Sequence, residues 1–198
     1  MAELVIVDTG CANINSVYFA IKRLGVEPLL SLDAKVIKAA PRVIVPGVGT
    51  AKAAMRNLAE RELISTLQQL QQPVLGICLG MQLLNAHSME GDVACLNLIP
   101  GEVAPLNAAG LRLPHMGWNT LNQLKAHPIL RGITEQDYFY FVHSFAVLPG
   151  AYTLAECDYG SQFAAVIGKD NVAGAQFHPE RSGKAGARLL QNFLEWQL

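Results

Sequence analysis

A short cysteine motif framed by two glycines constrains the fold of this chain most strongly. Residues 76–80 read Gly-Ile-Cys-Leu-Gly and lie between an apolar run and a helix-like run. A Gly-x-nucleophile-x-Gly pattern at a strand-to-helix turn is typical of a nucleophile elbow, in which both flanking positions must be small. The motif predicts that Cys78 projects from a tight turn at a helix N-terminus, whose partial positive charge favours a thiolate. Because free cysteines are also often buried for packing, the motif alone leaves a structural role for Cys78 open.

Short apolar runs alternate with helical patterns in the first half of the chain, which indicates βαβ units and a parallel sheet. The runs at residues 4–7, 28–32, 43–45 and 74–77 predict strands. Helices are expected from residue 14 to a stop at Gly25, from a Thr50 cap through Leu58, and over residues 63–70 and 79–86. We therefore expect an α/β fold, with a flavodoxin-like, open, mixed and mainly parallel sheet flanked by helices.

The second half of the chain has a different pattern. Residues 97–128 are rich in Pro, Gly and Asn and suggest irregular or edge structure. Four further strands, mostly connected by hairpins, are expected at 138–142, 152–157, 163–167 and 172–177, before a C-terminal amphipathic helix. Since no repeat or linker interrupts the pattern, we expect residues 1–198 to form a single domain.

Composition and charge exclude several classes of protein. The chain has 198 residues, 51% of them hydrophobic and 16% charged, with a formal net charge of −1. These values argue against disorder and give no basic surface for nucleic acid. The N-terminus does not resemble a signal peptide and no apolar run has membrane-spanning length, so we expect a cytoplasmic protein without membrane contact. Four separated cysteines and five histidines show no metal-ligand spacing, so neither a metal nor a cofactor is expected.

A second motif could supply the base that a nucleophilic cysteine needs. Residues 176–180 read Gln-Phe-His-Pro-Glu after an apolar run, and Pro179 restricts His178 to extended backbone. If this strand and the strand before Cys78 are neighbours, His178 can act as the base and Glu180 can orient it. An oxyanion hole could combine the Leu79 N–H with a donor from the turn at residues 47–49. Each residue alone would fit a structural role, but together they favour a catalytic triad.

Taken in order, three motifs make the chain resemble class I glutamine amidotransferases over almost its whole length. They are Pro-Gly-Val-Gly at 46–49, Gly-Ile-Cys-Leu-Gly-Met-Gln at 76–82, and Gln-Phe-His-Pro-Glu at 176–180. Three further segments, at residues 10–16, 113–119 and 140–144, resemble the glutaminase subunits of imidazole glycerol phosphate synthases. The Pro-His-Met-Gly-Trp-Asn run within 113–119 is the one that singles out this subfamily.

The resemblance implies a glutaminase of the hydrolase and lyase classes that serves L-histidine biosynthesis. Cys78 would form a glutamyl thioester and release ammonia, with His178 moving the protons. The residues implied in glutamine binding are Gly47, Gln82, Glu90, His143 and Ser144, and those implied in the oxyanion hole are Leu79, Val48 and Gly49.

The ammonia would pass to a synthase partner with a (βα)8-barrel fold, which makes imidazole glycerol phosphate and aminoimidazole carboxamide ribotide. Such a barrel needs about 250 residues, so it must be a separate chain and the pair a heterodimer. The residues that match the family's interface with this partner are Asn13, Asn15, Met116, Trp118, Tyr140 and Arg181.

Val48 interrupts the run of glycines that many amidotransferases have at the oxyanion turn. Its β-branched side chain narrows the backbone options. We therefore hypothesise that one oxyanion donor is misdirected at rest, and that docking of the synthase reorients the Val48–Gly49 peptide. Three alternatives stay open: a glutaminase of another synthase (that of GMP, anthranilate or pyridoxal phosphate), a flavodoxin-like binding module with a redox-sensing Cys78, and a cysteine peptidase on a related fold.

Overall fold

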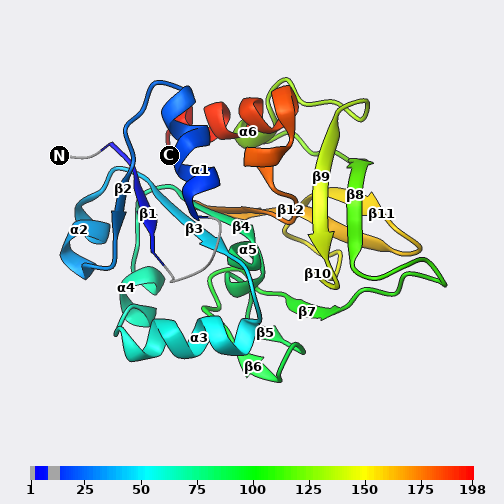
Figure 1. Cartoon of the computed structure of the whole chain (residues 1–198), viewed down its shortest axis with the longest axis horizontal. Coiled ribbons are helices and arrows are strands. Elements are labelled where there is room, and N and C mark those ends of the chain that lie inside the picture. Colours follow the sequence, from blue (N-terminus) through cyan, green and yellow to red (C-terminus); the bar gives the residue numbers. More distant parts are fainter. Residues whose placement is uncertain (1–2, 9–13) are drawn as a thin grey trace.

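An 11-stranded sheet forms the centre of the computed structural model, which describes residues 3–8 and 14–198 (Figure 1). The strand order is β2-β1-β3-β4-β13-β12-β10-β7-β5-β6, with β11 paired to β12. The strands of the first half of this path are parallel: β2 (Leu29–Ser31), β1 (Val5–Val7), β3 (Val43–Gly47), β4 (Val74–Cys78) and β13 (Val172–Ala175). Their order is that of a flavodoxin-like sheet, as expected.

The other half of the sheet is mostly antiparallel. Its strands are β12 (Gln162–Lys169), β11 (Thr153–Asp158), β10 (Phe145–Val147), β7 (Glu102–Pro105), β5 (His87–Ser88) and β6 (Val93–Ala94). One pair in this half, β5 with β7, is parallel and lies near the edge strand β6. The expected hairpins are confirmed, because β12 pairs antiparallel with both β11 and β13.

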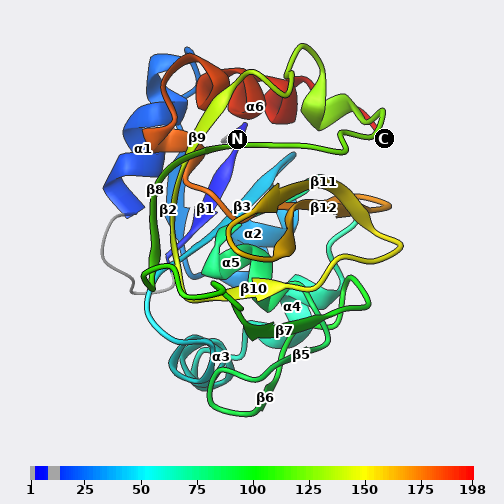
Figure 2. The ribbon, with the colours of Figure 1, turned by 90° about the vertical axis from the view of Figure 1, so that its right-hand side faces the viewer.

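Helices cover both faces of the parallel half, with α1 and α6 on one side and α3 and α4 on the other (Figures 1 and 2). The helices are α1 (Ile14–Arg23), α2 (Ala34–Ala39), α3 (Ala51–Glu60), α4 (Ile64–Gln68), α5 (Leu79–Leu83) and α6 (Gly183–Glu195), with 3₁₀ turns η1 (Pro128–Leu130) and η2 (Pro179–Arg181). Two predicted helix boundaries are confirmed. Thr50 Oγ1 accepts from the Ala53 N–H at the start of α3, and Gly25 follows α1 with a φ of +89°.

Side chains of alternate strand residues enter two hydrophobic clusters, one on each face. Leu4 and Ile6 pack in the cluster that contains the buried residues of α1 and α6. Val5 and Val7 pack in the cluster that contains those of α2, α3 and α4. Burial on both faces explains why the parallel strands are continuous apolar runs rather than alternating ones.

A second sheet of two antiparallel strands, β8 (His115–Thr120) and β9 (Tyr138–His143), lies beside the central sheet (Figure 1). The expectation of irregular or edge structure over residues 97–128 is wrong for β7, which lies inside the central sheet between β10 and β5, but it fits β8, which has a single paired neighbour. β8 pairs with a strand more than twenty residues later, His115 opposite His143, and such a long-range partner leaves no local signal. Within the described residues, no helix is both long and apolar enough to span a lipid bilayer.

Candidate active site

The predicted elbow is present at the end of β4, and its geometry requires both glycines. Cys78 has φ 53° and ψ −112°, a strained conformation for a residue with a side chain. A Cβ at Gly76 would lie 2.7 Å from the Gly80 carbonyl oxygen, and one at Gly80 would lie 1.8 Å from that of Val45. The backbone of α5 is therefore packed directly onto β3 and β4, and the turn places Cys78 at the carboxyl end of β4.

His178 and Glu180 lie at the end of the strand next to the elbow. β13 pairs parallel with β4, so residues 176–180 leave the sheet beside Cys78. His178 has extended backbone (φ −97°, ψ 95°) before Pro179, and its N–H donates to the Tyr140 carbonyl at 2.9 Å. The Glu180 Oε1 atom lies 2.8 Å from His178 Nδ1, and the Glu180 side chain is almost fully buried. The structure therefore places the Glu180 carboxylate against the imidazole, in a position from which it can orient the ring.

The surroundings of His178 favour its charged form. Burial by itself lowers the pKa of His178, but hydrogen bonds and charge from Cys78 and Glu180 outweigh burial and raise the pKa to about 10. The imidazole is thus held as an imidazolium between a sulfur and a carboxylate. A cysteine beside a charged imidazole that is held by a carboxylate is the arrangement expected around an activated nucleophile.

A cavity of about 280 Å³ opens above Cys78. Besides Val142, its wall is formed by residues that the sequence had singled out: Val48, Gly49, Cys78, Leu79, Gln82, Glu90, His143, Ser144 and His178. Gly47 instead lies beneath the elbow, where a Cβ would come within 2.8 Å of the Gly80 nitrogen. Its lack of a side chain is explained by packing rather than by contact with a ligand.

Two candidate oxyanion donors belong to residues of the cavity wall. Leu79 is the first residue of α5, and an N–H at that position has no intrahelical acceptor. Gly49 has a φ of +97°, in the left-handed region that favours glycine. A tight turn thus follows Val48, and it lies in the cavity wall together with Cys78.

Several polar groups of the cavity wall already have protein partners. Glu90 Oε2 accepts from the Ala51 N–H at 2.8 Å and so ties its loop to the start of α3. Both ring nitrogens of His143 are engaged, Nδ1 with the Phe145 carbonyl at 2.9 Å and Nε2 with His115 Nδ1 at 3.0 Å. Burial lowers the pKa of His143 to about 3, so this ring is neutral and contributes shape rather than charge.

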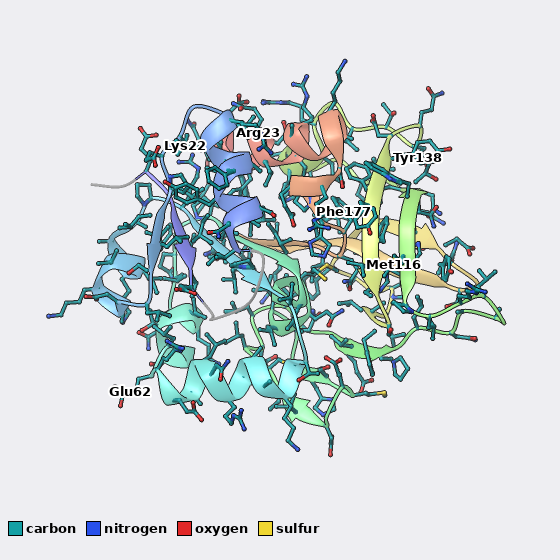
Figure 3. The ribbon with its side chains drawn as sticks, in the orientation of Figure 1. Lys22, Arg23, Glu62, Met116, Tyr138 and Phe177 are labelled. Atoms are coloured by element: carbon teal, nitrogen blue, oxygen red, sulfur yellow. The ribbon has the colours of Figure 1, made fainter. Side chains whose placement is uncertain are left out.

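The expected interface residues lie on or near the β8–β9 sheet. Met116 and Trp118 are 62% and 56% exposed on its outer face, and Figure 3 shows Met116 on β8 and Tyr138 on β9. The Tyr140 ring meets Trp118 edge-on, with 5.9 Å between centroids. Asn15 in α1 and Arg181 in η2 are exposed, whereas Asn13 lies outside the described residues.

The sequence reasoning gave no role to three buried residues that support the site. Gln176 Nε2 lies 3.8 Å from Cys78 Sγ, and Ser182 Oγ joins the Tyr140 N–H (2.9 Å) to the His178 carbonyl (2.7 Å). His115 contacts His143. Gln176 had a local signal, because a residue two positions before His178 in extended backbone points to the same side. The other two depend on long-range pairing and had none.

Across residues 3–8 and 14–198, no group of three or more His, Cys, Asp or Glu side chains is placed to hold a metal ion. The chemistry available here is that of a thiol, an imidazole, a carboxylate and backbone donors. Such a set suits acyl transfer through a thioester.

The chain is similar to known proteins over nearly its whole length. The family model "Glutamine amidotransferase class-I" matches residues 5–196. The imidazole glycerol phosphate synthase subunit HisH of Idiomarina loihiensis is 58% identical, over 99% of both chains. The HisH subunit of Colwellia psychrerythraea is 56% identical, over 98% of this chain and 93% of that protein.

Solved structures with low sequence identity share the fold. A crystal structure of a glutamine amidotransferase has a TM-score of 0.75 at 19% identity, covering 96% of this chain and 97% of that one. A glutamine amidotransferase of Thermotoga maritima has a TM-score of 0.65 at 13% identity, covering 97% and 82%.

Proposed function

Since the chain belongs to the class I glutamine amidotransferase family, we propose that it is the glutaminase subunit of an imidazole glycerol phosphate synthase in L-histidine biosynthesis. The observation that carries the proposal is the strained Cys78 elbow, which lies beside the His178–Glu180 pair and in the wall of the cavity. Residues 1–198 act as one glutamine amidotransferase domain, and the reaction takes place in the cytoplasm.

The reaction begins with attack of the Cys78 thiolate on the side-chain amide carbon of glutamine. The oxyanion that forms is stabilised by the Leu79 N–H and by a donor from the Val48–Gly49 turn. His178 gives its proton to the amide nitrogen, the C–N bond breaks, and ammonia leaves. His178 then removes a proton from water, which attacks the thioester and releases glutamate. Glu180 keeps the imidazole oriented through both steps.

Glutamine is bound by groups lining the cavity. Gln82, Glu90, His143 and Ser144 surround it, and a volume of about 280 Å³ suits an amino acid, since sites for larger ligands reach about 1,000 Å³. The Glu90 carboxylate is the group suited to the α-ammonium of the substrate. Because both His143 nitrogens are engaged, this residue contributes its ring face and backbone.

The ammonia passes to a separate synthase subunit with a (βα)8-barrel fold, docked on the face formed by Met116, Trp118 and Tyr140, with Arg181 and Asn15 at its border. Aromatic side chains are common anchors of protein interfaces. Docking reorients the Val48–Gly49 peptide and so completes the oxyanion hole. This coupling would prevent glutamine from being wasted when no synthase is bound.

The test is ammonia release from glutamine by the wild type and by Cys78→Ala, each with and without the histidine-pathway barrel and its nucleotide ligand. We expect slow turnover by the isolated wild-type chain, strong activation by the loaded barrel, and no turnover by Cys78→Ala. Unchanged ammonia release in Cys78→Ala would refute the mechanism. Equal rates with and without the barrel would refute the docking-dependent oxyanion turn, and activation only by another synthase would reassign the partner.

A further inference from the structure

A chain of buried amides ends at the sulfur of Cys78. Gln82 Nε2 lies 2.9 Å from the Phe145 carbonyl and 3.0 Å from Gln176 Oε1. Gln176 Nε2 in turn lies 3.8 Å from Cys78 Sγ. Gln176 is fully buried and Gln82 is 4% exposed, so water does not compete for these bonds.

The Phe145 carbonyl, at the end of the row of amides furthest from Cys78, determines which groups donate and which accept. The Phe145 carbonyl can only accept, so Gln82 must present its NH₂ group there. The second N–H of that group faces Gln176, which must therefore present its carbonyl oxygen. Only one orientation of the Gln176 amide remains, and it places the NH₂ group against Cys78.

The Phe145 carbonyl is itself fixed from a second side. His143 Nδ1 donates to it at 2.9 Å, which makes His143 Nε2 the acceptor of the His115 Nδ1–H at 3.0 Å. His115 and His143 are both neutral, because burial lowers the pKa of His115 to about 4 and that of His143 to about 3. The donors and acceptors are therefore mutually consistent in every hydrogen bond between His115 in β8 and the sulfur of Cys78.

We propose that Gln176 is a positioning residue whose amide N–H holds the Cys78 sulfur as a thiolate. A thiolate accepts a hydrogen bond far better than a thiol does, so a buried donor aimed at the sulfur favours the ionised form. The thiol form has a competing partner, because Cys78 Sγ also lies 3.9 Å from the Val142 carbonyl. Gln176 shifts the balance between these forms, and this inference rests on the nucleophilic role in the proposed function.

Three other titratable groups lie near Cys78 and also influence the charge of its sulfur. The imidazolium of His178, from the segment after β13, supplies positive charge. Neutral His143 from β9 and the Glu90 carboxylate from the turn between β5 and β6 share the cavity wall. Gln176 contacts the sulfur but does not line the cavity, so it can act without touching the substrate.

The inference is tested by the pH dependence of alkylation of Cys78 by iodoacetamide, in the full-length chain. Mass spectrometry of the peptide that contains Cys78 separates its reaction from that of the other cysteines. Gln176→Glu keeps an acceptor for Gln82 but replaces the donor with a carboxylate. Gln176→Met removes the donor with little change in side-chain length, and it serves as the second variant if Gln176→Glu does not fold.

We expect the alkylation midpoint to rise by about one pH unit in Gln176→Met, which is roughly a tenfold lower rate at acidic pH, and by more in Gln176→Glu. The matched control is Asn192→Ser. It alters another buried amide, bonded to the carbonyls of Ile129 and Arg131, and should leave the midpoint unchanged. Glutaminase activity in the presence of the barrel should recover at alkaline pH in Gln176→Met, which a purely structural defect would not permit.

Two negative results are distinguishable. A low midpoint in the wild type that stays the same in folded Gln176→Met would overturn the role of Gln176 alone. A wild-type midpoint near the value of an ordinary thiol, about 8.5, would overturn both this inference and the thiolate mechanism of the proposed function.

Discussion

Single glycines determine whether the nucleophile can be presented at all. Gly76 and Gly80 are positions where the backbone of α5 touches β3 and β4, with would-be Cβ contacts of 2.7 and 1.8 Å to carbonyl oxygens. These contacts are to main-chain atoms, which cannot rotate away as a side chain can. The strained Cys78 backbone is therefore maintained by close packing around it rather than by its own preference.

Gly80→Ala should destabilise the protein by about 3 kcal/mol, the upper end for overpacking of a core, and should abolish glutamine hydrolysis. Gly150→Ala is the matched control, because its Cβ would meet nothing within 4 Å. Thermal unfolding and ammonia release measure the two effects. A Gly80→Ala variant with wild-type melting temperature would contradict the packing described here.

Cys78 and, after it, Glu180 raise the pKa of His178, so both affect how far its imidazolium persists towards alkaline pH. Since the folded-state pKa is raised to about 10 from the ordinary 6.5, protonated His178 stabilises the fold below about pH 6.5, and this stabilisation is lost as the pH rises towards 10. Glu180→Gln removes the charge and should move the alkaline limb of kcat/KM down by about one pH unit or more.

The same variant should lose stability relative to the wild type most strongly below pH 6.5, with the difference shrinking towards pH 10. Denaturant unfolding at several pH values checks this trend. Glu60→Gln, at an exposed carboxylate paired with Arg56, is the control and should leave both profiles unchanged. An alkaline limb that does not move in Glu180→Gln would rule out the orienting pair.

At the scale of elements, the β8–β9 sheet has two different faces. Its outer face exposes Met116 and Trp118, while its inner face buries Phe139, Phe141 and a pair of histidines. His115 stacks on Tyr159 with 4.0 Å between ring centroids and donates to His143. The sheet therefore separates the docking surface from the cavity, and its buried histidines must stay neutral.

The neutral histidine pair predicts a steep loss of stability in acid. Unfolding lets His115 and His143 take up protons below their ordinary pKa of 6.5, so the free energy of unfolding falls as the pH drops towards 4. His115→Gln removes one of these sites. Between about pH 4.5 and 6 its stability should fall less steeply than that of the wild type, by about 1.4 kcal/mol per pH unit.

Urea unfolding at half-unit pH steps measures both slopes. Between pH 7.5 and 8.5, where neither histidine is protonated, the two curves should run parallel, which serves as the internal control. Identical slopes in acid would mean that His115 is already protonated in the folded protein.

Elements that depend on neighbouring residues could be predicted from the sequence, whereas elements that depend on long-range pairing could not. The Cys78 elbow and the His178 turn follow from adjacent residues, with glycines at fixed offsets and a proline after the histidine. The parallel strands follow from continuous apolar runs. β8 and the His115–His143 contact depend on a register that pairs residues 18 to 28 positions apart along the chain, and two of the inward-facing positions of β8 are occupied by Gly117 and Asn119 rather than by apolar side chains.

At the scale of the whole molecule, the central sheet runs from the edge strand β2 to the edge strand β6. The edge strand β2 lies at the far side from the β8–β9 sheet (Figure 1). The candidate catalytic residues lie at the end of β4 and in the segment after β13, and the cavity wall is completed by residues of β9 and of the turn between β5 and β6. A partner that contacts the β8–β9 face can therefore influence the cavity through β9, whose Tyr140 carbonyl accepts from the His178 N–H.

Trp118→Ala should weaken binding of the synthase barrel by about 2 kcal/mol or more, roughly a 30-fold higher Kd, because exposed aromatic residues dominate protein interfaces. The melting temperature should hardly change, since Trp118 is 56% exposed and its truncation leaves no cavity. Leu29→Ala is the matched control, as Leu29 is 43% exposed but lies in β2. Calorimetric titration of each variant with the barrel measures Kd. Equal affinities for the two variants would mean that the partner docks elsewhere. If a saturating concentration of the barrel activates glutamine hydrolysis by Trp118→Ala less than by the wild type, the Trp118 side chain also couples docking to the cavity.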